Sequence, residues 1–346
     1  MLEHRNTLLD LHTFIPAFFY PTHIYFVDDN DTFLKKLPLL LDDGLLYKSF
    51  NSASQVLECI EKPGVKAASD VSAFFVSDEE SSSTPFGKSK ININLSTLAQ
   101  QILNTERFNE VSVLVVDYSM PGMNGIELCQ HLSKHPGKKI MLTGQADQHI
   151  AIKAFNEGLI DKFILKSDPD AISYLNQSIV ELQLEYFKAK TQSLLAAISA
   201  ESGFSLRDAS FIKMFKRICE QNSIVEFYLI ESSGSFLMRD KEGRPTWLIV
   251  RTAKDLEMYY EVAREDKAPE KVLSQIKSCQ AIPFFANSND FYSVTADSWE
   301  KYLYPAKTVR GNIDYNYFTI SHLPHYPLEF RQEDNYQSHL NKAWAS

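Results

Sequence analysis

The stretch Val111–Gly125 constrains the fold more than any other part of the chain. It begins with the apolar, largely β-branched run Val111–Val116, which is typical of a strand buried on both faces of a sheet. The run ends at Asp117, and Met120–Gly125 then predicts a loop, because proline lacks an N–H and glycine tolerates positive φ. Apolar residues at helical spacing follow in Ile126–Leu132. This pattern predicts an open α/β sheet with a carboxylate at the strand end where such sheets bind ligands.

Three further segments have the same form, a short apolar strand followed at once by polar side chains. They are His23–Val27 followed by Asp28 and Asp29, Lys138–Leu142 followed by Thr143, and Asp161–Leu165 followed by Lys166. Parallel strands joined by helices bring their carboxyl ends to one edge of the sheet. We therefore expect three carboxylates, one hydroxyl and one ammonium group in a single crevice.

Such a set has a definite chemistry. Clustered carboxylates repel one another unless a cation neutralises them, and Mg²⁺ prefers a site made of oxygen ligands and water. A carboxylate beside the cation can attack a phosphoryl group, while the cation and Lys166 stabilise the charge on the transferring oxygens. A single acid in such a position could merely begin a loop, so the prediction depends on the whole set.

This combination resembles the receiver domain of two-component response regulators. The matching features are Asp28-Asp29, Asp117 with Met120–Gly125 after it, Thr143, Phe163 and Lys166. The resemblance implies a flavodoxin-like, doubly wound parallel sheet of five strands. It also implies a phospho-acceptor signalling protein, with at most a weak autophosphatase activity, that receives its phosphoryl group from a sensor histidine kinase or a phosphotransfer protein.

The resemblance also implies a role for each matching residue. Asp117 would be the phospho-acceptor, and Mg²⁺ would be held by Asp28, Asp29, Asp117 and the main-chain carbonyl of Ser119. Thr143 and Lys166 would contact the phosphoryl oxygens, and Phe163 would change rotamer with the phosphorylation state.

One departure from the family pattern follows Lys166. Receiver domains usually have proline directly after this lysine, in a cis peptide. Here Ser167 and Asp168 follow, and proline comes only at Pro169. We therefore expect the loop to take a different path while the lysine keeps its charge.

The sequence divides into four predicted parts. They are a leader (1–22), a receiver (23–185) with an insertion at about 63–108, a helical linker (186–202) and an output domain (203–346). The leader is apolar at Phe14–Tyr20 and is expected to dock on the receiver or on a second subunit. The insertion is long for a compact domain. It could dock a partner, but a tolerated surface excursion is favoured because loops accept insertions at little cost.

A helix is predicted from Asp170 to about Ala200. Its apolar residues follow a heptad spacing at Ile172, Leu175, Ile179, Leu182, Tyr186 and Ala189. About 30 residues give a helix of ~45 Å, roughly twice the length needed to cover the sheet. The second half needs another partner, either the next domain or the same helix of a second subunit. The polar opposite face slightly favours a homodimer through this helix and its extension.

The output domain is predicted to be α+β on an antiparallel sheet. A helix capped by Ser205 or Asp208 precedes a three-stranded meander and two helices, and a hairpin forms around Gly311. Ser233-Gly234-Ser235 with Asp240 and Glu242 faintly resembles a nucleotidyltransferase pattern, although the acids come too soon and on a turn. A nucleotide-binding output and a nucleic-acid-binding output stay open as alternatives, since the aromatic tail could stack bases or pack a core.

Composition narrows the class of protein. A net charge of −9 lacks the positive excess of a strong nucleic-acid binder. The four cysteines show no paired spacing, and no apolar run reaches ~18 residues. The amino-terminal residues do not form a signal peptide pattern. These features predict a cytoplasmic protein with reduced thiols that does not enter membranes.

The overall layout, an extended receiver joined by a long helix to this output domain, is similar to the quorum-sensing response regulators of the α-hydroxyketone (Lqs) system of Legionella. This similarity implies input from autoinducer-sensing kinases through a phosphorelay. The implied output is control of growth-phase and virulence programmes.

Overall fold

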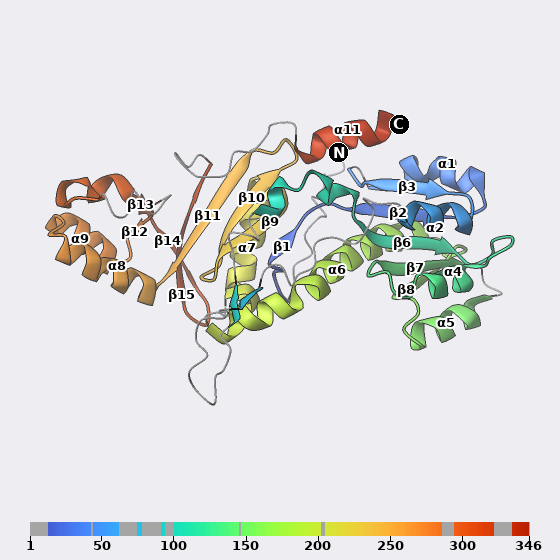
Figure 1. The fold of residues 1–346 in the computed structure, drawn as a ribbon, viewed down its shortest axis with the longest axis horizontal. Helices are drawn as coiled ribbons and strands as arrows, with labels where there is room; N and C mark the ends of the chain where they lie inside the picture. Colours follow the sequence, from blue (N-terminus) through green and yellow to red (C-terminus); the bar gives the residue numbers. More distant parts are fainter. Residues whose placement is uncertain are drawn as a thin grey trace.

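Two β-sheets lie one after the other along the long axis of the molecule, and helix α6 (Ala171–Glu201) runs from one to the other (Figure 1). The coordinates are a computed structural model. The structure describes residues 13–42, 44–61, 75–77, 91–93, 100–144, 147–201, 205–285, 294–321 and 334–345.

The first sheet is the predicted receiver fold. Its five parallel strands have the order β3-β2-β6-β7-β8. Their bounds are β2 His23–Val27, β3 Tyr47–Phe50, β6 Val111–Asp117, β7 Lys138–Thr143 and β8 Lys162–Leu165. This order confirms the doubly wound, flavodoxin-like topology, in which the strand order reverses beside β2.

Helices cover both faces of this sheet, which explains why its strands are apolar throughout. The helices are α1 Asp31–Leu40, α2 Ala53–Glu61, α4 Gly125–His131, α5 Gln148–Asn156 and the first half of α6. Leu37 of α1 and Ile179 of α6 belong to the core on one face. Val56 of α2, Leu128 of α4 and Ala151 of α5 belong to the core on the other.

The second sheet confirms the predicted α+β output domain. Its strands have the order β1-β9-β10-β11-β15-β14. The bounds are β1 Phe18–Phe19, β9 Ile224–Glu231, β10 Ser235–Asp240, β11 Pro245–Thr252, β14 Lys307–Arg310 and β15 Asp314–Ile320. The last two strands form the hairpin predicted around Gly311.

Other elements pack on both faces of the second sheet. Helix α7 (Ala209–Gln221) lies on one face. The other face is covered by the helices α8 Ala253–Glu265, α9 Glu270–Lys277 and η6 Ala296–Tyr302 and by the short strands β12 Ala281–Pro283 and β13 Leu303–Pro305. Of the two predicted caps, Asp208 is the N-cap of α7, because its carboxylate accepts from the amide of Ser210 at 2.8 Å. Ser205 lies in the preceding 3₁₀ turn, η5 Ser205–Arg207.

The amino-terminal segment is not the leader that the sequence suggested. Phe18 and Phe19 form the edge strand β1, which pairs antiparallel with Tyr228 and Phe227 of the output sheet. Their side chains are buried in the output core because the pairing places them beside α6. The segment just before β2 therefore belongs to the output domain, and the chain enters the receiver at β2. Residues 1–12 lie outside the described residues.

The insertion contributes to the interface between the two domains. It contains the hairpin β4 Phe75–Ser77 and β5 Ile91–Ile93, followed by the 3₁₀ turns η2 Gln100–Leu103 and η3 Thr105–Asn109. Ile102 and Phe108 belong to the output core, so the expectation of a surface excursion is wrong for this part. Residues 62–74, 78–90 and 94–99 lie outside the described residues.

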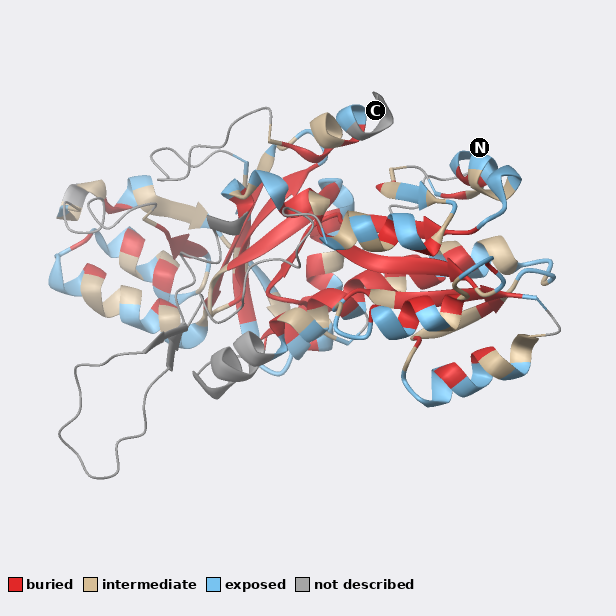
Figure 2. Ribbon diagram, turned by 45° about the vertical axis from the view of Figure 1, so that its right-hand side comes forward, coloured by how far each residue is buried: buried red, intermediate tan, exposed pale blue. Residues whose placement is uncertain are grey.

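Helix α6 is covered by its own chain as far as Thr191. Leu175, Ile179 and Leu182 pack on the receiver sheet, whereas Tyr186 and Phe187 pack in the output core. Figure 2 shows this continuous burial through the middle of the molecule. The heptad stripe up to Tyr186 is thus occupied by the next domain, and the predicted two-helix seam between subunits is not available there.

The carboxyl-terminal helix α11 (Tyr336–Ala345) returns to the receiver. The Tyr336 hydroxyl donates to the Gly44 carbonyl oxygen. The His339 ring lies 5.7 Å from the His23 ring and 5.4 Å from the Phe108 ring. Both chain ends are therefore involved in joining the domains.

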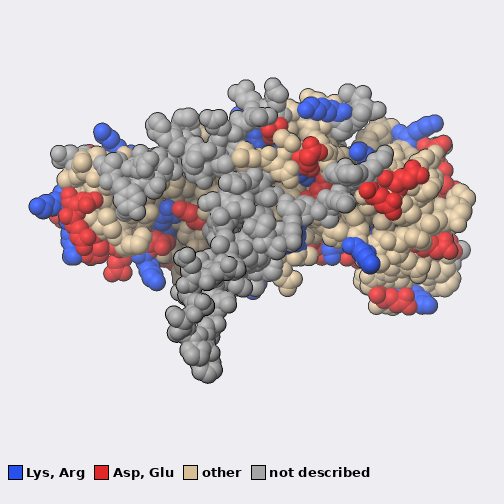
Figure 3. All heavy atoms as spheres, viewed as in Figure 1, with Lys and Arg blue, Asp and Glu red and all other residues tan. Residues whose placement is uncertain are grey.

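The surface shows no gathering of one charge on the face seen in Figure 3, where acidic and basic side chains are interspersed among the described residues. Among these residues, none of the helices is both long enough and apolar enough to span a bilayer.

Candidate functional site

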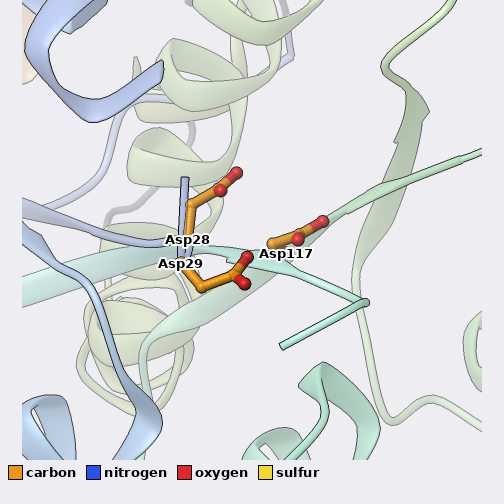
Figure 4. Close-up of side chains that lie close together, drawn as sticks. All are labelled: Asp28, Asp29 and Asp117. Atoms are coloured by element: carbon orange, nitrogen blue, oxygen red, sulfur yellow. The ribbon is translucent and has the colours of Figure 1, made fainter. Parts of the chain in front are cut away.

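Three aspartates meet at the carboxyl ends of two neighbouring strands. Asp28 and Asp29 directly follow β2, and Asp117 is the last residue of β6, which pairs with β2. One carboxylate oxygen from each lies within 4.8 Å of the others, and Figure 4 shows the three side chains gathered at these strand ends. Asp28 and Asp117 are buried, whereas Asp29 is exposed. The acidic cluster is therefore partly buried, and Asp29 lies on its exposed side.

Lys166 neutralises part of this charge. Its ammonium nitrogen lies 2.7 Å from Asp28 Oδ2 and 2.9 Å from Asp117 Oδ1. The Lys166 amide donates to the Thr143 carbonyl oxygen at 2.9 Å, which fixes the start of its loop to the neighbouring strand. Three carboxylates and one ammonium group leave two negative charges. A divalent cation would balance them.

The environment shifts the pKa values of both bonded partners. Burial, together with Asp28 and Asp29, raises the pKa of Asp117 above its ordinary value, although Lys166 opposes the shift. Burial alone would lower the pKa of Lys166, but its hydrogen bonds to Asp28 and Asp117 outweigh burial and raise it. Lys166 therefore stays protonated at neutral pH.

The backbone of the loop after Asp117 requires glycine at two positions. Gly122 has φ of +83°, a conformation that side chains rarely adopt. A Cβ on Gly125 would lie 2.4 Å from the Asp117 carbonyl oxygen, so this position needs glycine to let α4 begin beside the strand end. Asn124 caps α4 and forms a reciprocal capping box with Glu127. The local sequence thus fixes the backbone that carries the Asp117 side chain.

The remaining predicted residues surround this crevice. Thr143 ends β7, is fully buried and donates its hydroxyl to the Gly144 carbonyl oxygen at 3.2 Å. Phe163, on β8, is half-buried and meets the Phe155 ring edge-on at 6.3 Å. Ser119 is exposed in the loop after Asp117. The described chain has no cis peptide bond, so the Lys166–Ser167 link is trans, unlike the usual family pattern.

Two neighbours of the site were not predicted. The main-chain amide of Asn30 donates to Asp28 Oδ1 at 2.9 Å, and the side chain of Asn30 caps α1. The Phe33 ring lies 5.6 Å from the Lys166 nitrogen. Both residues stand at the start of the helix that follows Asp28-Asp29. The start of this helix lies at the same edge of the sheet as the aspartates, so this position in the sequence could have indicated them.

The output domain does not assemble the nucleotidyltransferase pattern. Ser235 begins β10 and Asp240 ends it, so the two lie about 16 Å apart along the strand. Asp240 is paired with Arg244 at 2.5 Å, and Ser235 accepts from the Val250 amide at 2.9 Å. Among the described residues, only Asp28, Asp29 and Asp117 form a group that could hold a metal ion.

Similarity to known proteins covers nearly the whole chain. The structure of the Legionella pneumophila response regulator LqsR superposes with a TM-score of 0.78 at 34% sequence identity, covering 96% of this chain and 97% of that one. Receiver domain proteins from Clostridium thermocellum and Methanospirillum hungatei match at 19% and 21% identity over 50% and 49% of this chain, and over 98% of each of theirs. Their TM-scores are 0.31 and 0.32.

The family model described as the response regulator receiver domain matches residues 80–174. This stretch contains Asp117, Thr143 and Lys166 but not Asp28 and Asp29, which the insertion separates from the rest of the domain. No curated protein sequence is significantly similar to the chain.

Proposed function

This chain belongs to the response-regulator family, and on that basis we propose that Asp117 accepts a phosphoryl group from a histidine kinase or a phosphotransfer protein. The observation that carries the proposal is the contact of Lys166 with Asp117 and Asp28 beside a third carboxylate. This set provides a nucleophile, a fixed positive charge and room for one cation in a single crevice.

The acidic crevice suits Mg²⁺. All the side-chain donors are hard oxygens, their oxygens lie close enough to share one ion, and their net charge with Lys166 is −2. Asp28, Asp29, Asp117 and the Ser119 carbonyl would hold the ion. When bound, it would neutralise carboxylate repulsion and the charge on the phosphoryl oxygens.

The residues of this chain can carry the transfer itself. A carboxylate oxygen of Asp117 attacks the phosphorus, forming an O–P bond as the P–N bond to the donor histidine breaks and the imidazole keeps the electron pair and takes up a proton. Lys166 can stabilise the negative charge on the phosphoryl oxygens, because its ammonium group already contacts Asp117. Thr143 would exchange its bond to the Gly144 carbonyl for one to a phosphoryl oxygen. Phe163 would then reorient against Phe155.

Removing one metal ligand tests the cation site. We expect Asp28→Asn to lower the Mg²⁺ affinity by at least about tenfold, because even outer-shell partners of metal ligands are worth that much. Calorimetric titration with Mg²⁺ measures it. Asp31→Asn is the matched control, since Asp31 is an exposed aspartate on α1 outside the cluster. Equal affinities for Asp28→Asn and the native chain would contradict the assignment.

The raised pKa of Asp117 predicts an unusual acid limit. A protonated carboxyl group neither binds Mg²⁺ nor attacks phosphorus, so labelling falls as the pH drops through the pKa of Asp117. Because burial raises this pKa in the metal-free site, the fall at low Mg²⁺ concentration should begin at a higher pH than for an exposed aspartate. Initial labelling rates with acetyl phosphate across acidic pH, at a Mg²⁺ concentration too low to saturate the site, measure it. A profile that stays flat down to the ordinary aspartate pKa would rule the shift out.

We further propose that the chain acts as a switch and not as an enzyme, and that it serves quorum sensing through a phosphorelay that controls growth-phase and virulence programmes. The similarity to the Legionella regulator over nearly the whole length of both chains supports this role. Homodimerisation is part of the proposal. Since the heptad stripe of α6 is covered, the exposed Ile152 and Phe155 of α5 and the exposed Tyr174 of α6 offer the apolar surface for it.

A further inference from the structure

A buried polar cluster joins the receiver to the output domain at the end of the sheet opposite the aspartates. The Glu110 cluster consists of Tyr20, Glu110, Tyr186 and Lys190. The Glu110 carboxylate accepts from the Tyr20 hydroxyl at 2.6 Å, from the Tyr186 hydroxyl, and from the Lys190 ammonium at 2.6 Å. Lys190 also donates to the Tyr20 hydroxyl at 3.3 Å. The side chains of Glu110 and Lys190 are 2% and 10% exposed, so solvent screens this ion pair only weakly.

Three members of the Glu110 cluster lie on or beside the two elements that connect it with the phosphorylation site. Glu110 directly precedes β6, whose last residue is Asp117. Tyr186 and Lys190 lie on α6, which begins at Ala171 shortly after Lys166. The two elements therefore meet again at one carboxylate, about 23 Å along β6 from Asp117 and about 29 Å along α6 from Ala171.

The remaining member belongs to the output domain. Tyr20 directly follows β1, the edge strand that pairs with β9. Its ring packs against Phe187 of α6 at 4.8 Å and lies 6.4 Å from the ring of Tyr228 on β9. Any change in how α6 meets β6 must therefore act on the edge of the output sheet.

We propose that the Glu110 cluster transmits the phosphorylation state of Asp117 to the output sheet. The proposal rests on the proposed phosphoryl transfer. A phosphoryl group on Asp117 competes with Asp28 for Lys166, and a displaced Lys166 shifts the start of α6. A rigid helix carries this shift to Tyr186 and Lys190, while β6 holds Glu110 in place. Tyr20, Tyr186 and Lys190 cannot all stay bonded to Glu110 when α6 moves relative to β6. One hydrogen bond therefore breaks, and the pairing of β1 with β9 weakens.

Hydrogen exchange of the full-length protein tests this coupling, with and without acetyl phosphate and Mg²⁺. We expect phosphorylation to speed amide exchange in β1 and in residues 186–191 by at least about fivefold, the lower end of ordinary allosteric couplings. In Glu110→Gln, exchange there should already be fast without the phosphodonor. It should not change further, although Asp117 is labelled as in the native chain.

A matched pair of tyrosine variants keeps the test valid if Glu110→Gln fails to fold. Tyr186→Phe removes one donor to Glu110 and should weaken the exchange response several-fold. Tyr25→Phe removes an equally buried hydroxyl from the receiver core and should leave the response unchanged. A native-sized response in Tyr186→Phe would overturn the proposal.

Intact-mass analysis of the same samples distinguishes this proposal from the proposed phospho-acceptor role of Asp117, on which it rests. Native protein that is labelled but shows no exchange response refutes the coupling alone. Native protein that takes up no label refutes the phospho-acceptor role, and the coupling with it.

Discussion

Replacing Asp117 with asparagine should reduce phosphoryl labelling to background. An amide is a poor nucleophile toward phosphorus, and its neutral oxygen is a weaker ligand for Mg²⁺ than a carboxylate. The fold should survive, because Lys166 keeps its 2.7 Å contact with Asp28. Incubation with acetyl phosphate and Mg²⁺ followed by intact-mass analysis measures the loss. Light scattering of the same samples shows whether labelling changes the oligomeric state, which Asp117→Asn should also prevent.

A second aspartate of the receiver provides the control for this variant. Asp161 is partly buried and paired with Lys138 at 2.9 Å, and it precedes β8 at the opposite end of the sheet from the aspartate cluster. Asp161→Asn should label at the native rate. Label that persists in Asp117→Asn would show that another residue accepts the phosphoryl group, and the assignment would fail.

Replacing Glu226 with glutamine should destabilise the protein by about 3–5 kcal/mol, the usual cost of removing one partner from a buried ion pair. Glu226 is fully buried on β9 between two guanidinium groups, at 2.9 Å from Arg107 and 3.1 Å from Arg239. The Tyr228 hydroxyl also donates to it at 2.9 Å. Glutamine would remove the negative charge that Arg107 and Arg239 share and would turn an amide NH₂ group toward one of the two guanidinium groups.

Chemical denaturation followed by circular dichroism measures this loss. The matched control is Glu300→Gln, which removes an exposed partner of Lys271 at 3.2 Å in the same domain. Such surface pairs contribute little, so the control should unfold close to the native midpoint. A loss below about 1 kcal/mol in Glu226→Gln would mean that the two arginines find other partners, and the buried pair would then be of minor importance.

The receiver was predictable because its signals are local. Each strand is an unbroken apolar run, and each polar residue stands at a fixed place just after it. The rule that parallel strands share one carboxyl edge then brought Asp28, Asp117 and Lys166 together before any coordinates. Four residues of the heptad stripe are buried as expected, namely Leu175, Ile179, Leu182 and Tyr186, whereas Ile172 is half-buried and Ala189 is exposed. The stripe did not indicate what covers the helix.

The joins between the domains were not predictable, since their signals are not local. The strand Phe18–Phe19 is only two residues long, lies between Pro16 and Pro21, and pairs with a segment far along the chain. Arg107 reads as a solvated charge in the sequence, yet its guanidinium bonds to Glu226 in the buried interface. No periodic pattern in the sequence indicates such pairings, because each side chain meets its partner only after both sheets have formed.

The order in which the chain is synthesised has a consequence for strand β1. Phe18 and Phe19 leave the ribosome roughly 200 residues before their partners on β9, a wait of about 10–40 s at ordinary elongation rates. The strands of the receiver sheet are all made during that interval, whereas Phe18 and Phe19 cannot yet pair. The edge of the output sheet is therefore completed only when translation reaches β9, after the receiver sequence is already available to fold.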